Sequence, residues 1–239
     1  MSETPPALQL HALRYRWPGA AADTLAIDAL ALRPGDSVFL RGPSGCGKST
    51  LLSLAAGVLL PDSGMVQLLG QDWASLGASA RDRHRADHLG YIFQQFNLLP
   101  YLSVLDNVRL PLRFSARRAR RAARGEAERL LERSGLARAL WGQPAAWLSV
   151  GQQQRVAAAR ALIGRPELVI ADEPTSALDE PLREAFMDLL LQHCAEAGSA
   201  LLFVSHDSRL ATRFQRQIDL PAINLAPQWA EPARLGVVT

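Results

Sequence analysis

A loop that could hold phosphate groups is encoded by residues 42–49, where two glycines separated by four residues are followed by lysine and serine. Glycine lets a backbone pass close to phosphates, and the N–H groups of such a loop point inward. Lys48 offers a compact positive charge to the outer phosphates, and Ser49 offers a hydroxyl to Mg²⁺. The pattern predicts a nucleoside triphosphate site made of Gly42, Pro43, Ser44, Gly45, Cys46, Gly47, Lys48, Ser49 and Thr50.

Two residues of this loop, Lys48 and Cys46, are informative for different reasons. Lys48 is the single lysine among 26 basic residues, so its place in the motif is difficult to attribute to composition. Cys46 leaves two interpretations open. A helix N-terminus close by favours a reactive thiolate, whereas a loop also tolerates cysteine simply as a small residue.

A second chemical centre is predicted where apolar segments end in polar residues. The run 168–171 is followed by Asp172 and Glu173, and a later apolar run ends at His206. Parallel strands present their carboxyl ends at one edge of a sheet, where ligands bind. Asp172 is then placed to hold Mg²⁺, and Glu173 to polarise the attacking water. For His206 a purely structural role and a contact to the γ-phosphate both remain open.

Composition excludes several classes of protein. The 239 residues are 48% hydrophobic and 21% charged, which excludes a disordered chain. Cys46 and Cys194 alone cannot build a disulfide framework. A net charge of +3 gives little reason to expect a nucleic-acid partner. The N-terminus lacks the pattern of a signal peptide and no apolar run reaches eighteen residues, so we expect a cytoplasmic protein.

Strand-like and helix-like patterns alternate along the chain and indicate an α/β fold with a mainly parallel sheet. The middle, from 103 to 163, is helical throughout and is expected to form an inserted lobe. Strands are predicted at 8–15, 24–32, 37–40, 64–69, 89–93, 168–171 and 200–204, and helices at 51–59, 104–114, 116–134, 150–162, 182–197 and 207–214.

One further segment discriminates among nucleotide-binding classes. A GTPase of the Asn-Lys-x-Asp type is excluded because the chain has no second lysine. Residues 148–155, Leu-Ser-Val-Gly-Gln-Gln-Gln-Arg, resemble the Leu-Ser-Gly-Gly-Gln signature of ATP-binding subunits of ABC transporters. Gln94, Asp179 and His206 fall in the order of that family's other motifs. Residues 89–100 look most like the lipoprotein-releasing and macrolide-exporter subfamily.

The resemblance implies a fold and a division of the chain. The fold is α/β: a P-loop NTPase core with a mainly parallel sheet, an N-terminal antiparallel β layer and an inserted helical subdomain. Residues 1–239 form a single ABC ATPase domain. Its core spans about 1–95 and 164–239, and its helical subdomain about 96–163.

The resemblance also implies roles for individual residues. Tyr15 would stack on adenine, with Trp17 as the alternative, and Gln94 would contact Mg²⁺ or the attacking water. The cofactors are ATP and Mg²⁺, with Ser49, Gln94 and Asp172 as metal ligands. The catalytic residues are Glu173, His206 and Gln94. Two copies would pair head to tail, so that one chain's signature (Ser149, Val150, Gly151 and Gln152) meets the other's ATP, with Asp179 at the seam.

Val150 departs from the signature, where the family has glycine. A β-branched residue is strained at this position if the backbone needs a positive φ. A second departure is that residues 218–225 lack the Asp-Gly turn of the family's C-terminal hairpin.

The resemblance implies a transmembrane permease as partner, which would hold this chain at the inner face of the cell membrane. We expect docking near Gln94 through the apolar segment 96–102. The functional alternatives are an uptake system, a soluble ABC ATPase outside transport, and a non-enzymatic scaffold. The run 117–124, with arginines on one helix face, is interpreted either as a solvated surface or as a contact to acidic partners.

Overall fold

The computed structural model describes residues 5–176 and 178–227. A parallel sheet has the strand order β6-β7-β8-β3-β9, and every neighbouring pair is parallel. β7 and β8 are buried along almost their whole length, which explains their uninterrupted apolar sequences. The five strands are β3 (Ser37–Arg41), β6 (Leu89–Ile92), β7 (Leu168–Asp172), β8 (Ala200–Val204) and β9 (Arg216–Asp219).

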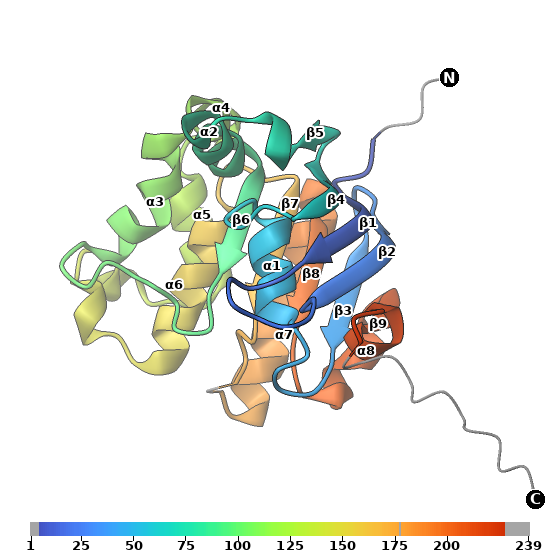
Figure 1. Ribbon diagram of the computed structural model, residues 1–239. Helices are drawn as coiled ribbons and strands as arrows, with labels where there is room; N and C mark the ends of the chain where they lie inside the picture. Colours follow the sequence, from blue (N-terminus) through green and yellow to red (C-terminus); the bar gives the residue numbers. More distant parts are fainter. Residues whose placement is uncertain (1–4, 177, 228–239) are drawn as a thin grey trace, which may run out of the picture.

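An antiparallel sheet has the order β2-β1-β4-β5. α1 (Lys48–Ala55) packs between the two sheets, since it contacts both β4 and β7. Figure 1 shows this layering, with the antiparallel sheet and the helical part on opposite sides of the parallel sheet. The strands are β1 (Leu8–Tyr15), β2 (Leu25–Leu32), β4 (Ser63–Leu68) and β5 (Gln71–Asp72).

Helices dominate the middle of the chain, and a long helix precedes β8. They are α2 (Ala78–His88), α3 (Val104–Phe114), α4 (Ala116–Arg121), α5 (Glu126–Arg133), α6 (Val150–Leu162), α7 (Glu180–Ala197) and α8 (Leu220–Ile223). Short 3₁₀ turns lie at Trp73–Ser75, Arg138–Leu140, Ala145–Trp147 and Ser208–Arg213. Among the described residues, no helix has the length and apolarity needed to cross a bilayer.

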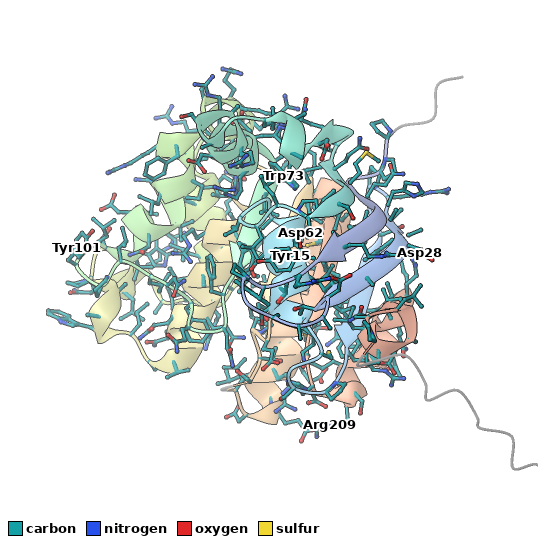
Figure 2. All side chains as sticks on the ribbon, viewed as in Figure 1. Tyr15, Asp28, Asp62, Trp73, Tyr101 and Arg209 are labelled. Carbon is teal, nitrogen blue, oxygen red and sulfur yellow. The ribbon has the colours of Figure 1, made fainter. Side chains whose placement is uncertain are left out.

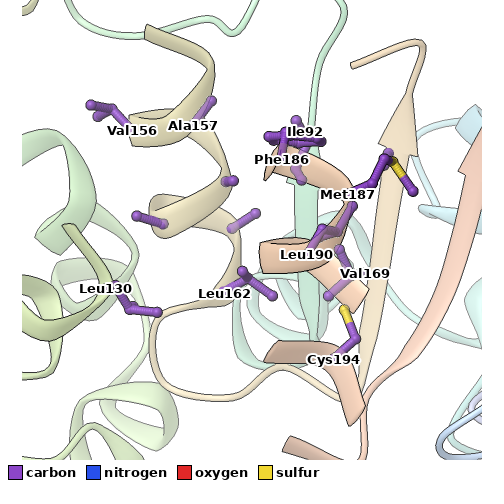
Figure 3. Close-up of a cluster of buried hydrophobic side chains, with 14 of the residues drawn as sticks. Ile92, Leu130, Val156, Ala157, Leu162, Val169, Phe186, Met187, Leu190 and Cys194 are labelled. Atoms are coloured by element: carbon purple, nitrogen blue, oxygen red, sulfur yellow. The ribbon is translucent and has the colours of Figure 1, made fainter. Parts of the chain in front are cut away.

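Alternate residues of the parallel strands enter two different cores, because successive side chains of a strand point to opposite faces. Val169, Ala171 and Phe203 pack with α6 and α7, and Figure 3 shows Val169 beside Leu190 and Cys194 of α7. Ile170 and Leu202 pack instead with α1 and the antiparallel sheet. The parallel sheet is therefore covered on both faces and fixed in position.

The α/β fold with two sheets and a helical middle is as predicted, but several elements differ. The single helix predicted for 116–134 is wrong, because Gly125 adopts a φ of 72° and begins a new helix, α5. α2 escaped prediction since its sequence is polar on every side. The helix predicted at 207–214 is a 3₁₀ turn over Ser208–Arg213. At the C-terminus, β9 runs directly into α8, and residues 228–239 lie outside the described part.

Candidate nucleotide site

Four polar segments follow four strands of the parallel sheet. The phosphate-binding loop follows β3, Asp172 ends β7, His206 comes two residues after β8, and Gln94 two residues after β6. Parallel strands place these ends at one edge of the sheet, where ligands bind in folds of this kind. Sheet topology thus brings together groups that are up to 164 residues apart in sequence, from Gly42 to His206.

The loop after β3 has the backbone of a phosphate cradle. Gly45 and Gly47 have φ values of 81° and 98°, and α1 begins directly at Lys48. The Lys48 side chain is buried, and its Nζ donates to the carbonyl oxygens of Gly42 at 2.8 Å and Pro43 at 3.0 Å. The ammonium is therefore folded back over the loop, where it can exchange these carbonyls for phosphate oxygens.

Cys46 lies inside the loop rather than on its surface. Its side chain is 1% exposed, and its Sγ lies 2.6 Å from the position that a Cβ on Gly42 would occupy. Burial raises the pKa of this thiol, and this effect outweighs the opposing charge of Lys48. The geometry therefore favours the small, packed residue over the reactive thiolate.

Asp172 lies close to two charges at the end of β7. Burial raises the pKa of its carboxyl, and the neighbouring Glu173 raises it further, while Lys48 opposes both. A carboxylate in this position favours a nearby cation. The hydroxyl of Ser49, the carboxylate of Asp172 and the side-chain amide oxygen of Gln94 are hard oxygen donors of the kind that Mg²⁺ prefers. The donor set on this edge therefore suits Mg²⁺.

Glu173 is held in a sparsely populated backbone conformation, with φ at 45°. Its N–H donates to the carbonyl of Val204 at 2.9 Å, which ties it to the end of β8. Its carboxylate Oε1 lies 2.6 Å from His206 Nε2. Strained non-glycine residues persist where their surroundings fix them, and they cluster at functional sites.

The two candidate aromatic residues for the base differ in accessibility. Tyr15, the last residue of β1, is 6% exposed and belongs to the core between the sheets. Trp17 is 45% exposed, meets Tyr15 edge to face, and donates from Nε1 to Thr50 Oγ1 at 3.3 Å. The alternative residue, Trp17, is therefore the aromatic ring that lies open beside the phosphate-binding loop.

The signature residues begin α6, away from the phosphate-binding loop in sequence. Ser149 caps the helix, with its Oγ accepting from Gln152 N at 3.4 Å and the Gln152 side chain accepting from Ser149 N at 2.9 Å. Val150 is the first helical residue, is half exposed and is not among the described residues with positive φ, so the suspected strain is not found. Asp179 caps α7 by accepting from Leu182 N.

Sequence reasoning did not identify the residues that hold the site's surroundings. Arg160 donates to the carbonyls of Phe96 and Asn97, both of which have positive φ, and the buried Asn107 side chain binds both polar groups of the Leu99 backbone. Gln154, on α6, donates to Pro174 O beside Glu173. Only Gln154 had a signal in the sequence: it is a polar residue on the face of α6 that otherwise buries apolar side chains.

Comparison with known proteins identifies the family. Residues 26–176, well over half of the chain, match the model described as ABC transporter. The chain belongs to the ABC transporter family. The lipoprotein-releasing system ATP-binding protein LolD 2 of Caulobacter vibrioides is 42% identical over 217 residues, which cover 90% of this chain and 94% of that protein. An uncharacterised ABC transporter ATP-binding protein of Escherichia coli K12, YbbA, is 43% identical over 191 residues, with 80% and 83% coverage.

Solved structures agree with this assignment. The ATP-binding cassette MJ0796, in a dimeric post-hydrolysis state with ADP and Pi, superimposes with a TM-score of 0.79 at 34% identity, covering 89% of this chain and 93% of that one. The present chain is thus an ABC cassette, an ATP-binding and ATP-hydrolysing subunit. The likeness to lipoprotein-releasing cassettes, expected from the sequence, is confirmed.

Proposed function

We propose that this ABC cassette hydrolyses Mg²⁺-ATP as a head-to-tail pair and thereby drives a membrane-embedded permease in export or lipoprotein release. The observation that carries the proposal is the meeting of Glu173 and His206 at 2.6 Å, on the sheet edge that also holds the phosphate-binding loop. The likeness to LolD proteins supports lipoprotein release as the transport step. The alternatives are an uptake system and a soluble ABC ATPase outside transport.

In this proposal each residue has a defined task. Lys48 leaves the carbonyls of Gly42 and Pro43 and binds the outer phosphates. Ser49, Asp172 and Gln94 hold Mg²⁺, which supplies charge neutralisation at the phosphates. Glu173 accepts the proton of the attacking water, while His206 orients the carboxylate and contacts the γ-phosphate.

The second copy would complete the site. Helix α6 presents backbone N–H groups at its N-terminus beside Ser149 and Gly151, and a helix N-terminus favours an anion. In a head-to-tail pair these groups reach the γ-phosphate held by the other chain, with Asp179 at the seam. The dimeric state of MJ0796 supports this arrangement.

An apolar groove of about 470 Å³ suits a short helix of the permease. It lies between α1, α2, β6 and α3, and its wall includes the exposed side chains of Val58, Phe93 and Phe114. Phe93 directly precedes Gln94, so a helix bound in the groove would act on the nucleotide site through the backbone at Gln94. Of the segment 96–102, Phe96 is buried and Tyr101 is 75% exposed, but neither lines this groove. Figure 2 places Tyr101 at the outer end of the helical part, far from Tyr15.

The catalytic assignment is tested by Glu173→Gln. We expect ATP binding to remain and turnover to fall at least ~10²-fold, the scale of general-base removal. The variant should also accumulate as an ATP-dependent dimer in size-exclusion chromatography. Glu184→Gln, at an exposed residue paired with Arg213, is the matched control and should hydrolyse ATP normally. Turnover at the wild-type rate in Glu173→Gln would refute the assignment.

A further inference from the structure

Gln154 lies where the signature helix, α6, contacts the turn after β7. It is fully buried in the fifth position of α6, and its Nε2 donates a hydrogen bond to the carbonyl oxygen of Pro174. Pro174 is itself buried and follows Glu173 directly. The Gln154 side chain therefore connects the helix that begins beside Ser149 to the turn that carries the general base.

The turn needs such a connection because Glu173 has a φ of 45°, a conformation that a non-glycine residue does not keep unaided. Two restraints come from β8 and the residues after it: the bond from Glu173 N to Val204 O and the contact with His206. On its other side, the carbonyl oxygen of Glu173 accepts from Ser176 N at 3.3 Å within the turn. The bond from Gln154 holds the next peptide, between Pro174 and Thr175, from a different layer of the fold.

The other half of the Gln154 amide is unpaired. Its Oε1 is buried and has no hydrogen-bond partner among the described residues. Gln154 lines a cavity of about 230 Å³ between α6 and α7, together with Gly151, Leu178 and Leu182. Buried polar groups are normally paired, so an unsatisfied oxygen in a native structure calls for an explanation. The amide is thus paired through its donor alone, and the cavity provides space between the start of α6 and α7.

We propose that Gln154 is a positioning residue that holds the Glu173–Pro174 turn in its catalytic conformation and transmits movement of the signature helix to it. This inference rests on the proposed function, in which Glu173 acts as the base and α6 meets the partner's ATP. Because Ser149 and Gln154 share one helix, docking of α6 on the other chain's phosphate acts on this chain's own base. Gln154 touches no nucleotide itself.

The test compares Gln154→Met with Gln153→Met. Methionine keeps the length of the side chain and removes the donor. Gln153 is the neighbouring glutamine, and among the described residues its side chain donates only to the nearby carbonyl of Leu148. We expect Gln154→Met to lower kcat at least ~10-fold, since small displacements of a reacting group are costly. The KM for ATP should stay within ~3-fold and ATP binding should persist. Gln153→Met should stay within ~2-fold of wild type in both parameters.

Gln154→Leu supplies a second variant of similar volume. A leucine donates nothing to Pro174 O, so the same loss of kcat is expected although the space remains filled. Wild-type kcat in both variants would overturn the inference. A fall in kcat that comes with a similar fold-loss of ATP affinity and a lower melting temperature would overturn it too. Unfolding of both variants would assign Gln154 a purely structural role. If Glu173→Gln retains full turnover, the proposed function fails; if that variant is inactive and Gln154→Met is fully active, only this inference fails.

Discussion

At the scale of single residues, the family resemblance and the structure favour different aromatic residues for the contact to the nucleobase. Tyr15 ends β1 with its ring turned into the core, because an irregularity at Ala12, whose φ is 47°, shifts the alternation that begins at Leu8 and places Leu13 and Tyr15 inward. Trp17 lies beyond the strand, where this alternation no longer applies, and is held over Thr50. The geometry thus favours Trp17 as the residue that stacks on adenine.

Trp17→Leu should weaken ATP binding by about tenfold, because stacking on a base contributes about 1–3 kcal/mol. Tyr15→Leu should leave the affinity of the folded protein unchanged, although it lowers stability by emptying part of the core. Titration with a fluorescent ATP analogue, read beside melting curves, measures both effects. An unchanged dissociation constant in Trp17→Leu, with a large loss in Tyr15→Leu, would restore Tyr15 as the base contact.

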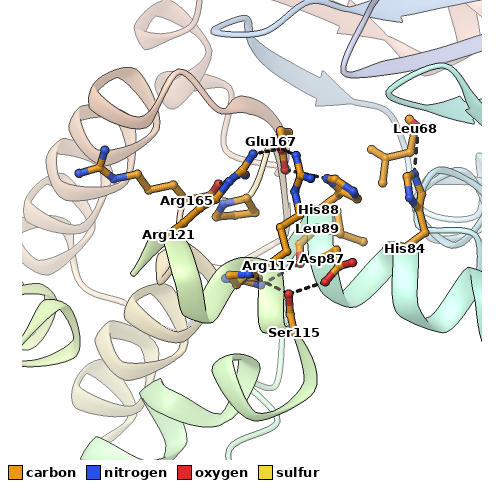
Figure 4. Close-up of polar contacts among 12 residues, drawn as sticks. Leu68, His84, Asp87, His88, Leu89, Ser115, Arg117, Arg121, Arg165 and Glu167 are labelled. Carbon is orange, nitrogen blue, oxygen red and sulfur yellow. Dashed lines mark hydrogen bonds and ion pairs between the residues drawn. The ribbon is translucent and has the colours of Figure 1, made fainter. Parts of the chain in front are cut away.

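At the scale of elements, the arginine-rich run 117–124 is in part the solvated surface that the sequence suggested, since Arg120 and Arg124 are exposed, but one of its arginines is buried. Arg118 is buried and donates to the carbonyls of Leu89, Ala161 and Ile163, which joins α4 to β6 and to the end of α6. Arg117 and Arg121 pair with Glu167, to which His88 also binds at 2.9 Å. Figure 4 shows this cluster between α2, α4 and the residue before β7.

Arg118→Met should lower the free energy of unfolding by about 3 kcal/mol or more, because three buried carbonyls lose their donor and each unsatisfied group costs about 1–3 kcal/mol. Arg120→Met, at an exposed residue in the last turn of α4, should cost less than about 0.5 kcal/mol. Urea unfolding of the two variants compares them directly. Equal stabilities would mean that α4 does not depend on Arg118.

Glu167 predicts an acid limit on stability. Burial alone would raise its pKa, but hydrogen bonds from His88 and Arg121 outweigh burial and hold the pKa at about 2, against 4.5 for a free glutamate. Since the folded pKa is depressed, the stabilisation is complete above pH 4.5 and is lost as pH falls toward 2. The full shift corresponds to about 3 kcal/mol.

The stability difference between wild type and Glu167→Gln should therefore be largest near neutral pH and shrink between pH 4.5 and 2. Urea titrations across this range measure it. Glu132→Gln, at a carboxylate that is 56% exposed, is the control and should show little pH dependence. A difference that stays constant with pH would show that the cluster acts through packing rather than charge.

The elements also show how far sequence reasoning reached. The phosphate-binding loop and β7 were predictable, since glycine spacing and an apolar run that ends in acids fix them locally. The break between α4 and α5 had a signal in the sequence, because Gly125 stands inside the helix predicted for 116–134. α2 had none, because a helix without an apolar stripe is stabilised by its neighbours. Gln154, Arg118 and Arg160 could not be found, because their partners lie 20 to 64 residues away and are set by tertiary packing.

At the scale of the whole molecule, the groove between α1, α2, β6 and α3 predicts where the permease binds. Phe114→Asp should abolish co-purification with membranes while the isolated chain remains folded and binds ATP, since Phe114 is 71% exposed. Leu225→Asp, at an exposed residue outside the groove, should still co-purify. If Tyr101→Asp loses the membrane and Phe114→Asp keeps it, docking occurs through segment 96–102 instead.

The capped start of α6 has a consequence for how such a pair would separate. Ser149 and Gln152 already satisfy each other's backbone N–H groups in the single chain. A phosphate arriving from the other chain would compete for these donors, so association becomes an exchange of acceptors rather than a net gain of hydrogen bonds. When the phosphate departs, the two side chains accept from the backbone N–H groups again, and neither N–H is left without an acceptor. The side chains of this turn thus occupy the phosphate-binding N–H groups when no nucleotide is there, which favours dissociation of the pair once the phosphate has gone.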